Sequence, residues 1–339
     1  MRGRVVLVGA VHECVAAFEA LVDSPHCDLV AVATLTPAAA ARVSGSVDLA
    51  GQAAARGIEV ILVEDVNDPG AVARIRQAQP DLVVVVGWTQ LIRDELLAVP
   101  THGCIGFHAS VLPRNRGRAP VNWAILRGEP EAGNTLMVLD PGADTGLVVD
   151  QRSTPITPTD DCATIYARVA ELGAQMLRDN LRPLLLGQAQ LRAQDEADAS
   201  VLPRRVPAMG VTDWTRTSRE LHDWIRAQTH PYPGAYTRLH GRHVTLWASE
   251  VPDPERDASV PAEAGTVVAL TPEGVRVGTG SGSMLVTRMG PADAPHTPAP
   301  DWAASVGLGV GAHFEQPPEE MVRWSLGHGP RPRELSPWA

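Results

Sequence analysis

Lysine is absent from this 339-residue chain, in which arginine supplies every cationic side chain apart from histidine. That bias, together with abundant alanine, glycine and proline, is typical of a GC-rich genome and excludes no function. Long hydrophobic runs are absent too: the longest, residues 82–86, has the length of a strand, whereas a membrane span needs ~18 apolar residues. The chain opens with a charged lead into a short apolar run that has no cleavage site. We therefore expect no signal peptide, no membrane partner and a cytoplasmic protein.

The chain also has few cysteines and fewer basic than acidic side chains. The four cysteines, Cys14, Cys27, Cys104 and Cys162, form no CxxC pair, so we expect buried thiols in a reducing compartment and no metal site. With a formal net charge of −10, the overall electrostatic field gives no help to nucleic-acid binding, although a local basic patch could still bind it. The length and an apolar content of 44% indicate a globular protein of two domains.

Short apolar runs alternate with helical patterns through residues 1–188. The expected strands are residues 5–9, 29–34, 60–63, 81–87, 104–107 and 134–139, and the expected helices are residues 12–23, 47–56, 71–79 and 163–186. This alternation predicts an α/β domain, a doubly wound parallel sheet of the Rossmann-like kind with helices on both faces. In such sheets, ligands bind at the carboxyl ends of the strands.

The second half of the chain has a different pattern. Residues 189–205 lack a clear period and are interpreted as a linker. Residues 206–292 hold one short helix, residues 218–228, and five short strands separated by glycine or proline, which predicts a small OB-like β-barrel. The Pro-rich tail, residues 293–339, is weakly periodic, so we expect a partly disordered or extended arm.

Two polar side chains follow expected strands of the first domain. His108 comes directly after residues 104–107, and Asp144 lies in the run Gly-Ala-Asp-Thr-Gly at residues 142–146. An imidazole titrates near pH ~6.5 and can take up and return a proton, and a carboxylate can orient the ring. The pair therefore predicts proton transfer during acyl transfer. The simpler alternatives are a satisfied core histidine and a turn-forming aspartate.

The motifs around these two residues resemble those of the formyltransferases that use N10-formyltetrahydrofolate. The family pattern is approximately Asn-x-His-x-Ser-Leu-Leu-Pro-x-x-Arg-Gly, and residues 106–117 read Gly-Phe-His-Ala-Ser-Val-Leu-Pro-Arg-Asn-Arg-Gly. The later loop is matched by residues 142–146, and the resemblance continues to the Pro-Tyr-Pro-Gly-Ala-Tyr run at residues 231–236. It implies a formyltransferase in which His108 is the acid and base and Asp144 assists it, with N10-formyltetrahydrofolate as the formyl donor.

The resemblance also implies binding residues. The donor is expected along Val86, Gly87, Trp88 and Leu91 and along the loop that holds Leu139 and Gly142. The candidates for contact with the amine substrate are Ser110, Arg114, Arg116, Arg118 and Asn122. The three arginines suit recognition of a phosphate or carboxylate, and the alternative is a solvated loop. For Trp88 the alternative is an ordinary core or rim aromatic.

This chain departs from the family pattern at Gly106. The family has asparagine there, whose amide donates to the developing oxyanion, and losing such a donor typically costs ~3 kcal/mol of transition-state stabilisation. A backbone N–H or a water could replace the donor, or a more reactive amine could need less help. Two other readings stay open: a different acyl-transfer reaction, and a protein that binds folate without turnover.

The identity of the amine is approached through charge. Members that formylate initiator methionyl-tRNA resemble one another in a basic loop after the second strand, whereas residues 36–47 hold only Arg42 as a basic side chain. We therefore expect a small amine, such as an amino-sugar nucleotide or an amino-acid derivative like hydroxyornithine, and no nucleic-acid partner. Methionyl-tRNA is the alternative substrate, and a homodimer is left open.

Overall fold

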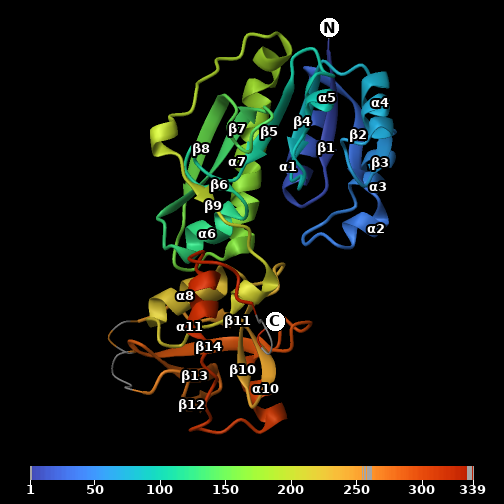
Figure 1. Ribbon diagram of the computed structural model, residues 1–339. Helices are drawn as coiled ribbons and strands as arrows, with labels where there is room; N and C mark the ends of the chain where they lie inside the picture. The colour runs from blue at the N-terminus through green and yellow to red at the C-terminus, as the bar shows by residue number, and fades with distance from the viewer. Residues whose placement is uncertain (1, 254, 256, 258–261, 334–337, 339) are drawn as a thin grey trace. The chain divides into compact units, whose positions relative to one another are not determined.

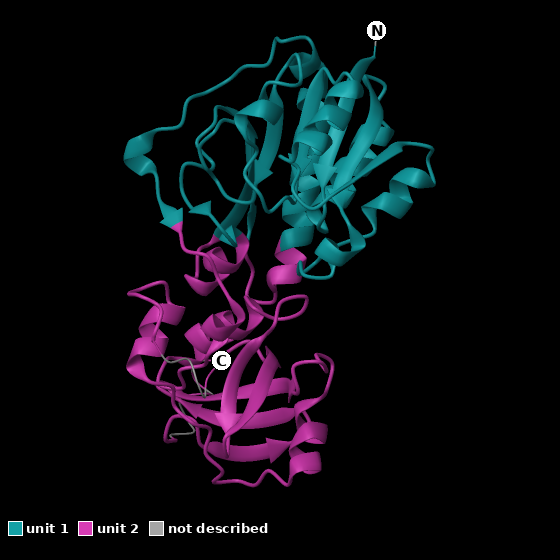
Figure 2. Cartoon of the chain, turned by 45° about the vertical axis from the view of Figure 1, so that its right-hand side comes forward, with its two compact units in different colours: residues 1–120, 131–155, 166–201 teal, residues 121–130, 156–165, 202–339 magenta. Residues whose placement is uncertain are grey.

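The chain divides into two compact units, which are described one at a time. The structure, a computed structural model, describes residues 2–253, 255, 257, 262–333 and 338 (Figure 1). Unit 1 comprises residues 1–120, 131–155 and 166–201, and unit 2 comprises residues 121–130, 156–165 and 202–339 (Figure 2). The sequence predicted a first domain of residues 1–188, a linker of residues 189–205 and a second domain from residue 206. It missed the two short excursions because their contacts are with residues distant in sequence.

Unit 1 is built on a seven-stranded sheet in the order β3-β2-β1-β4-β5-β7-β8. Its strands are β1 (Gly3–Gly9), β2 (Cys27–Leu35), β3 (Glu59–Val63), β4 (Leu82–Val86), β5 (Cys104–His108), β7 (Glu131–Val138) and β8 (Val148–Pro155). The first five strands of this order are parallel, and β7 and β8 are antiparallel to their neighbours. The predicted doubly wound α/β fold is thus confirmed, with an antiparallel edge. The strand order reverses between β1 and β4, where ligand crevices form in such sheets.

Helices cover both faces of this sheet. They are α1 (Glu13–Val22), α2 (Pro37–Ala40), α3 (Leu49–Ala54), α4 (Pro69–Gln77), α5 (Asp94–Leu97) and α7 (Cys162–Leu185), whose first four residues cluster with unit 2. Successive side chains of a strand point to opposite faces. Accordingly, Leu7 packs in one buried cluster with α1 and α7, whereas Val6 packs in another with α4 and α5. Among the described residues, no helix combines the length and apolar character needed to cross a membrane.

Unit 2 contains a five-stranded antiparallel sheet in the order β10-β11-β14-β13-β12, consistent with the small barrel expected here. Its strands are β10 (Ala235–Leu239), β11 (Arg242–Ser249), β12 (Val267–Thr271), β13 (Gly274–Thr279) and β14 (Gly282–Gly290). Its helices are α6 (Pro120–Leu126), α8 (Ser218–Arg226), α10 (Ala299–Val306) and α11 (Glu319–Ser325). A capping box of Thr217 and Glu220 starts α8, because each side chain accepts a hydrogen bond from the other's backbone N–H.

The tail differs from the expected partly disordered arm over its described residues. It forms α10 and α11, and Phe314 is fully buried with its ring stacked on Trp214 at a centroid distance of 5.5 Å. Ala299, Ala303 and Leu308 belong to the same buried cluster as the barrel. Proline density misled the prediction, since the prolines at 298 and 318 stand at the N-caps of these helices, where they do not disturb the helix.

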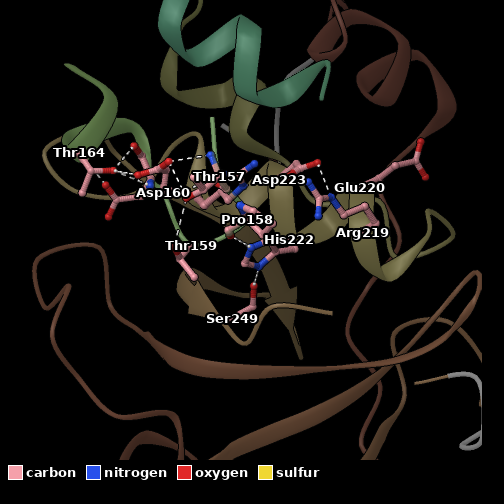
Figure 3. Close-up of polar contacts among 12 residues, drawn as sticks. Thr157, Pro158, Thr159, Asp160, Thr164, Arg219, Glu220, His222, Asp223 and Ser249 are labelled. Carbon is pink, nitrogen blue, oxygen red and sulfur yellow. Dashed lines mark hydrogen bonds and ion pairs between the residues drawn. The ribbon is translucent and has the colours of Figure 1, made fainter. Parts of the chain in front are cut away.

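A buried polar cluster joins α8 to residues 156–165 within unit 2 (Figure 3). The Arg226 guanidinium donates to the carbonyl oxygens of Thr157 at 2.9 Å and Asp160 at 2.5 Å. His222 Nε2 donates to the carbonyl oxygen of Pro158 at 2.9 Å, so its Nδ1 is left to accept from the Ser249 hydroxyl, also at 2.9 Å. Burial lowers the pKa of His222, which keeps the ring neutral in this arrangement.

Candidate active site

His108 is the last residue of β5 and lies at the carboxyl edge of the unit 1 sheet, as expected. Its ring is buried, with a relative exposure of 7%. Nε2 lies 2.7 Å from the carbonyl oxygen of Asn115, and Nδ1 lies 3.4 Å from Asp144 Oδ1. Both ring nitrogens therefore face acceptors. A neutral imidazole can donate to only one of them, and a ring that has gained a proton can donate to both.

Asp144 lies in the loop between β7 and β8. Its Oδ2 accepts a hydrogen bond from the backbone N–H of Gly117 at 2.8 Å, which leaves Oδ1 facing His108. Its φ is +59°, in the left-handed region that non-glycine residues rarely occupy. A Cβ on Gly146 would lie 1.7 Å from the carbonyl oxygen of Val138, so this turn requires glycine after the aspartate. The two motifs thus meet, and they place an imidazole and a carboxylate in contact.

The candidate residues for the amine substrate take different positions. The Ser110 hydroxyl donates to the carbonyl oxygen of Arg114 at 2.7 Å and so shapes the loop. Arg114 and Arg118 are exposed, and Arg118 donates to the carbonyl oxygen of Thr89 at 3.1 Å. Asn122 belongs to unit 2, where its buried amide donates to the carbonyl oxygen of Ala227 at 2.6 Å. Arg114 and Arg118 therefore remain the better candidates for contact with a ligand.

Arg116 is buried, unlike the other two arginines, with a relative exposure of 6%. Its guanidinium binds both carboxylate oxygens of Glu196 at 2.6 and 2.9 Å, and the side-chain oxygen of Gln194 at 2.8 Å. The hydrogen bonds to Glu196 raise the pKa of Arg116. Arg116 therefore differs from the expected substrate-binding residue: its donors bind Glu196 and Gln194, because the segment expected to be a linker folds back over it.

That segment contributes residues that sequence reasoning missed. Strand β9 (Val201–Leu202) pairs with the short strand β6 (Arg116–Gly117), and Glu196–Asp198 form a 3-10 helix. The Ser200 hydroxyl accepts from the Asn115 backbone N–H at 2.9 Å. A two-residue strand has no periodicity to detect. Only the polar run Gln-Asp-Glu at residues 194–196, unusual for a featureless linker, could have indicated contacts.

Of the residues expected to hold the donor, Val86, Gly87 and Trp88 lie at the end of β4, whereas Leu139 and Gly142 lie in the loop after β7. Val86 is the last residue of β4, and Gly87 follows with φ of +58°. The Trp88 ring packs against the buried cluster of Ala10, Leu35 and Ala39, and its buried Nε1 has no hydrogen-bond partner among the residues that the structure describes. Beyond it lies a cleft of about 590 Å³.

This cleft joins segments that are distant in sequence. Its lining includes Thr89, Leu91, Arg93, Arg118 and Pro141. Leu91 is 62% exposed and contributes an apolar side chain to the lining. The cleft thus combines an apolar surface with charges of both signs: the guanidinium groups of Arg93 and Arg118 lie with the carboxylates of Asp65, Asp94 and Glu95, and Arg93 Nη2 is 3.9 Å from Asp65 Oδ2.

The absence of a side chain at Gly106 has a structural counterpart. Gly106 lies on β5 opposite Met137 of β7. A Cβ built on Gly106 would lie 2.8 Å from Leu139 Cδ2, so the leucine side chain occupies the space that a larger residue would need. Gly106 and Leu139 therefore form a matched pair, and this chain has no room for an asparagine unless Leu139 moves.

The fold and these two motifs define a two-domain acyl-transfer protein, and comparison with known proteins gives the family. Residues 5–181 match the family model described as formyl transferase, and residues 206–307 match that of the formyl transferase C-terminal domain. The chain belongs to the formyl transferase family and is a formyltransferase.

Relatives and solved structures agree with this assignment. A methionyl-tRNA formyltransferase from Geobacter sulfurreducens is 38% identical over 232 residues, covering 68% of this chain and 71% of the relative. One from Trichlorobacter lovleyi is 35% identical over 255 residues, covering 75% and 78%. Among solved structures, the sugar 3N-formyl transferase WlaRD has a TM-score of 0.62 at 16% identity, covering 84% of this chain and 97% of that chain. HypX from Aquifex aeolicus, with tetrahydrofolic acid, has a TM-score of 0.61 at 21% identity, covering 85% of this chain but only 44% of HypX.

Proposed function

We propose that this protein transfers a formyl group from N10-formyltetrahydrofolate to the amine of a small metabolite. The observation that carries the proposal is the contact of His108 Nδ1 with Asp144 Oδ1, 3.4 Å apart at the carboxyl edge of the sheet. Two of the similar structures bear on the donor, since HypX was solved with tetrahydrofolic acid and WlaRD with 5-N-formyl-THF.

In this mechanism, a neutral amine attacks the formyl carbon and gives a tetrahedral adduct with an oxyanion and an ammonium group. His108 takes the ammonium proton and returns one to N10 of the folate as the carbon–nitrogen bond breaks. Asp144 holds the ring while it carries both protons, because its carboxylate faces Nδ1. Nε2 is engaged by the Asn115 carbonyl, so a substrate that exchanges a proton there competes with that carbonyl.

The cleft beyond Trp88 suits the donor. A folate has a flat polar pterin, an aromatic linker and a carboxylate tail. The exposed Leu91 offers an apolar contact for the ring system, and Arg118 offers a guanidinium group to the carboxylates. Arg93 lies 3.9 Å from Asp65 and would exchange that partner for a ligand carboxylate. Val86 and Gly87 lie at the end of β4, where backbone groups can be hydrogen-bonded by a pterin edge. Leu139 and Gly142 lie in the loop after β7, and their N–H groups already donate to Cys104 and Asp140, so a pterin would contact the side chain or the carbonyl groups there.

The acceptor is inferred from charge. Residues 36–47, which follow β2, contain Arg42 as their single basic residue. Part of this segment forms α2, and its Ala39 is buried against Leu35. A segment packed in this way presents little positive charge to a phosphate backbone, so a small amine is favoured over transfer RNA. Amino-sugar nucleotides and hydroxyornithine are the preferred classes.

The second candidate acceptor is initiator methionyl-tRNA. It is favoured by the names of relatives that are 34–38% identical to this chain and match it over 68–75% of its length. One experiment separates the candidates: 10-formyltetrahydrofolate is incubated with the protein and, in turn, a dTDP-linked amino sugar, N5-hydroxyornithine or initiator methionyl-tRNA, and tetrahydrofolate release is followed.

The proposal predicts release with a small amine that is lost in the His108→Ala variant. If tetrahydrofolate is released with initiator methionyl-tRNA and with neither small amine, the acceptor is the transfer RNA and the small-amine proposal is refuted. Folate binding without turnover of any of the three would indicate a binding protein and would refute transferase activity for these amines.

A further inference from the structure

We propose that Gln194 is a positioning residue for formyl transfer: it fixes the turn at Asp144 and so sets the direction of the carboxylate that faces His108. The inference rests on the proposed roles of His108 and Asp144. All four of its participants, Gln194, Arg116, Asp144 and His108, lie in unit 1.

Both the oxygen and the nitrogen of the Gln194 side-chain amide form hydrogen bonds. Its Oε1 accepts from Nη2 and Nε of Arg116 at 2.8 and 3.2 Å. Its Nε2 donates to the carbonyl oxygen of Asp144 at 2.9 Å and to that of Gly146 at 2.8 Å. A flipped amide would direct donors at donors and an acceptor at acceptors, so one orientation is selected. Gln194 therefore binds the backbone on both sides of Thr145.

The turn that Gln194 holds needs such support. Asp144 has φ of +59°, a conformation sparsely populated by residues with a Cβ unless their surroundings impose it. The backbone at this residue determines where its side chain points. If the two carbonyl bonds from Gln194 are lost, the turn can relax toward commoner conformations, and the carboxylate then moves away from His108 Nδ1.

The Asp144 carboxylate is held through the same hydrogen-bond network as the Asp144 carbonyl. Arg116 is fixed by Glu196, and its backbone N–H donates to the carbonyl oxygen of Ser200 at 2.9 Å. The next residue, Gly117, donates its N–H to Asp144 Oδ2. Gln194 and Arg116 thus bind each other. Gln194 contacts the Asp144 carbonyl, and Gly117, the residue after Arg116, contacts the Asp144 carboxylate.

The test compares Gln194→Ala and Gln194→Glu with the matched control Gln190→Ala, whose side chain is exposed in the same segment. Glutamate can still accept from Arg116 but cannot donate to the two carbonyl oxygens. We expect kcat to fall about 10²-fold in both variants, with KM for donor and amine within about threefold of wild type. The thermal midpoint should remain close to wild type, and the control should behave as wild type.

Two further measurements keep the result decisive. His108→Ala, assayed in parallel, establishes whether the pair is the site of catalysis: if it stays active, the proposed roles of His108 and Asp144 fail, whatever Gln194 does, and absence of turnover in the wild-type protein itself would refute the proposed function. The ¹⁵N chemical shifts of the His108 ring, recorded without substrate, should change in both Gln194 variants and not in Gln190→Ala. Unchanged kcat with unchanged ring shifts would overturn the positioning role, and so would a loss of kcat that follows only a loss of folded protein.

Discussion

At the scale of single residues, the pair of His108 and Asp144 makes the strongest prediction. Asp144→Asn keeps an oxygen that can accept from the Gly117 N–H but removes the charge that faces the imidazole. We expect kcat to fall by about 10²- to 10⁴-fold, the range for acid–base catalysis, with little change in the thermal midpoint. Single-turnover release of tetrahydrofolate measures it, with the exposed Asp198→Asn as control. A variant with wild-type kcat would exclude Asp144 from the reaction.

The matched pair of Gly106 and Leu139 makes a second prediction at this scale. Gly106→Asn alone places a Cβ 2.8 Å from Leu139 Cδ2, so we expect a loss of about 1–3 kcal/mol in unfolding free energy and no gain in rate. With Leu139→Ala beside it, the amide has room and can supply an oxyanion donor.

Relative to Leu139→Ala alone, the double variant should then gain up to about 10²-fold in kcat. Urea unfolding and steady-state kinetics of the three variants measure both effects. A rate gain from Gly106→Asn on its own would show that Leu139 yields easily and that the space is not truly filled.

At the scale of elements, the contact of α8 with residues 156–165 makes stability depend on pH (Figure 3). Burial lowers the pKa of His222, so the folded protein resists a proton that the unfolded chain accepts near pH ~6.5. Asp223, Arg219 and Arg226 also face this ring and act on its charge. The unfolded state binds more protons, and stability therefore falls as pH drops below about 6.5, by at most ~1.4 kcal/mol per pH unit for this group.

The measurement is urea unfolding at pH 7.5, 6.5 and 5.5. His222→Gln keeps one donor and one acceptor for Pro158 and Ser249 and should reduce the slope, with the exposed His26→Gln as control. Burial also lowers the pKa of His243, so part of the slope should remain. A slope unaffected by His222→Gln would refute this explanation.

The elements also show how far the sequence could predict the structure. Strands such as residues 82–86 and helices such as residues 162–185 were predictable because burial imposes a period on their side chains. Strand β8 was missed because its side chains are mostly half-buried and polar, which leaves little pattern. In the site, motif order identified His108 and Asp144. The contacts of Gln194 and Glu196 join residues about 50 to 80 positions apart, and no local pattern specifies such distances.

At the scale of the whole molecule, charge makes a prediction about the partner. A chain with a formal net charge of −10 repels a phosphate backbone except at a local basic patch. We expect initiator methionyl-tRNA not to be retained at ~0.15 M salt, with a Kd no tighter than the ~10⁻⁴ to 10⁻⁶ M typical of nonspecific binding. Filter binding over a series of salt concentrations measures this. Sub-micromolar retention with a steep salt dependence would contradict it and favour the transfer-RNA activity.

The return of residues 189–201 to the loops that carry Asp144 has a consequence for chimeras. A hybrid enzyme joined directly after α7 would take residues 189–201 from the protein that supplies its C-terminal half. A different side chain would then stand in place of Gln194. The catalytic unit would then lack its own residues 189–201, whose Gln194 binds the backbone of the Asp144 loop. A junction placed after Val201 keeps residues 189–201 together with the unit 1 loops that they contact.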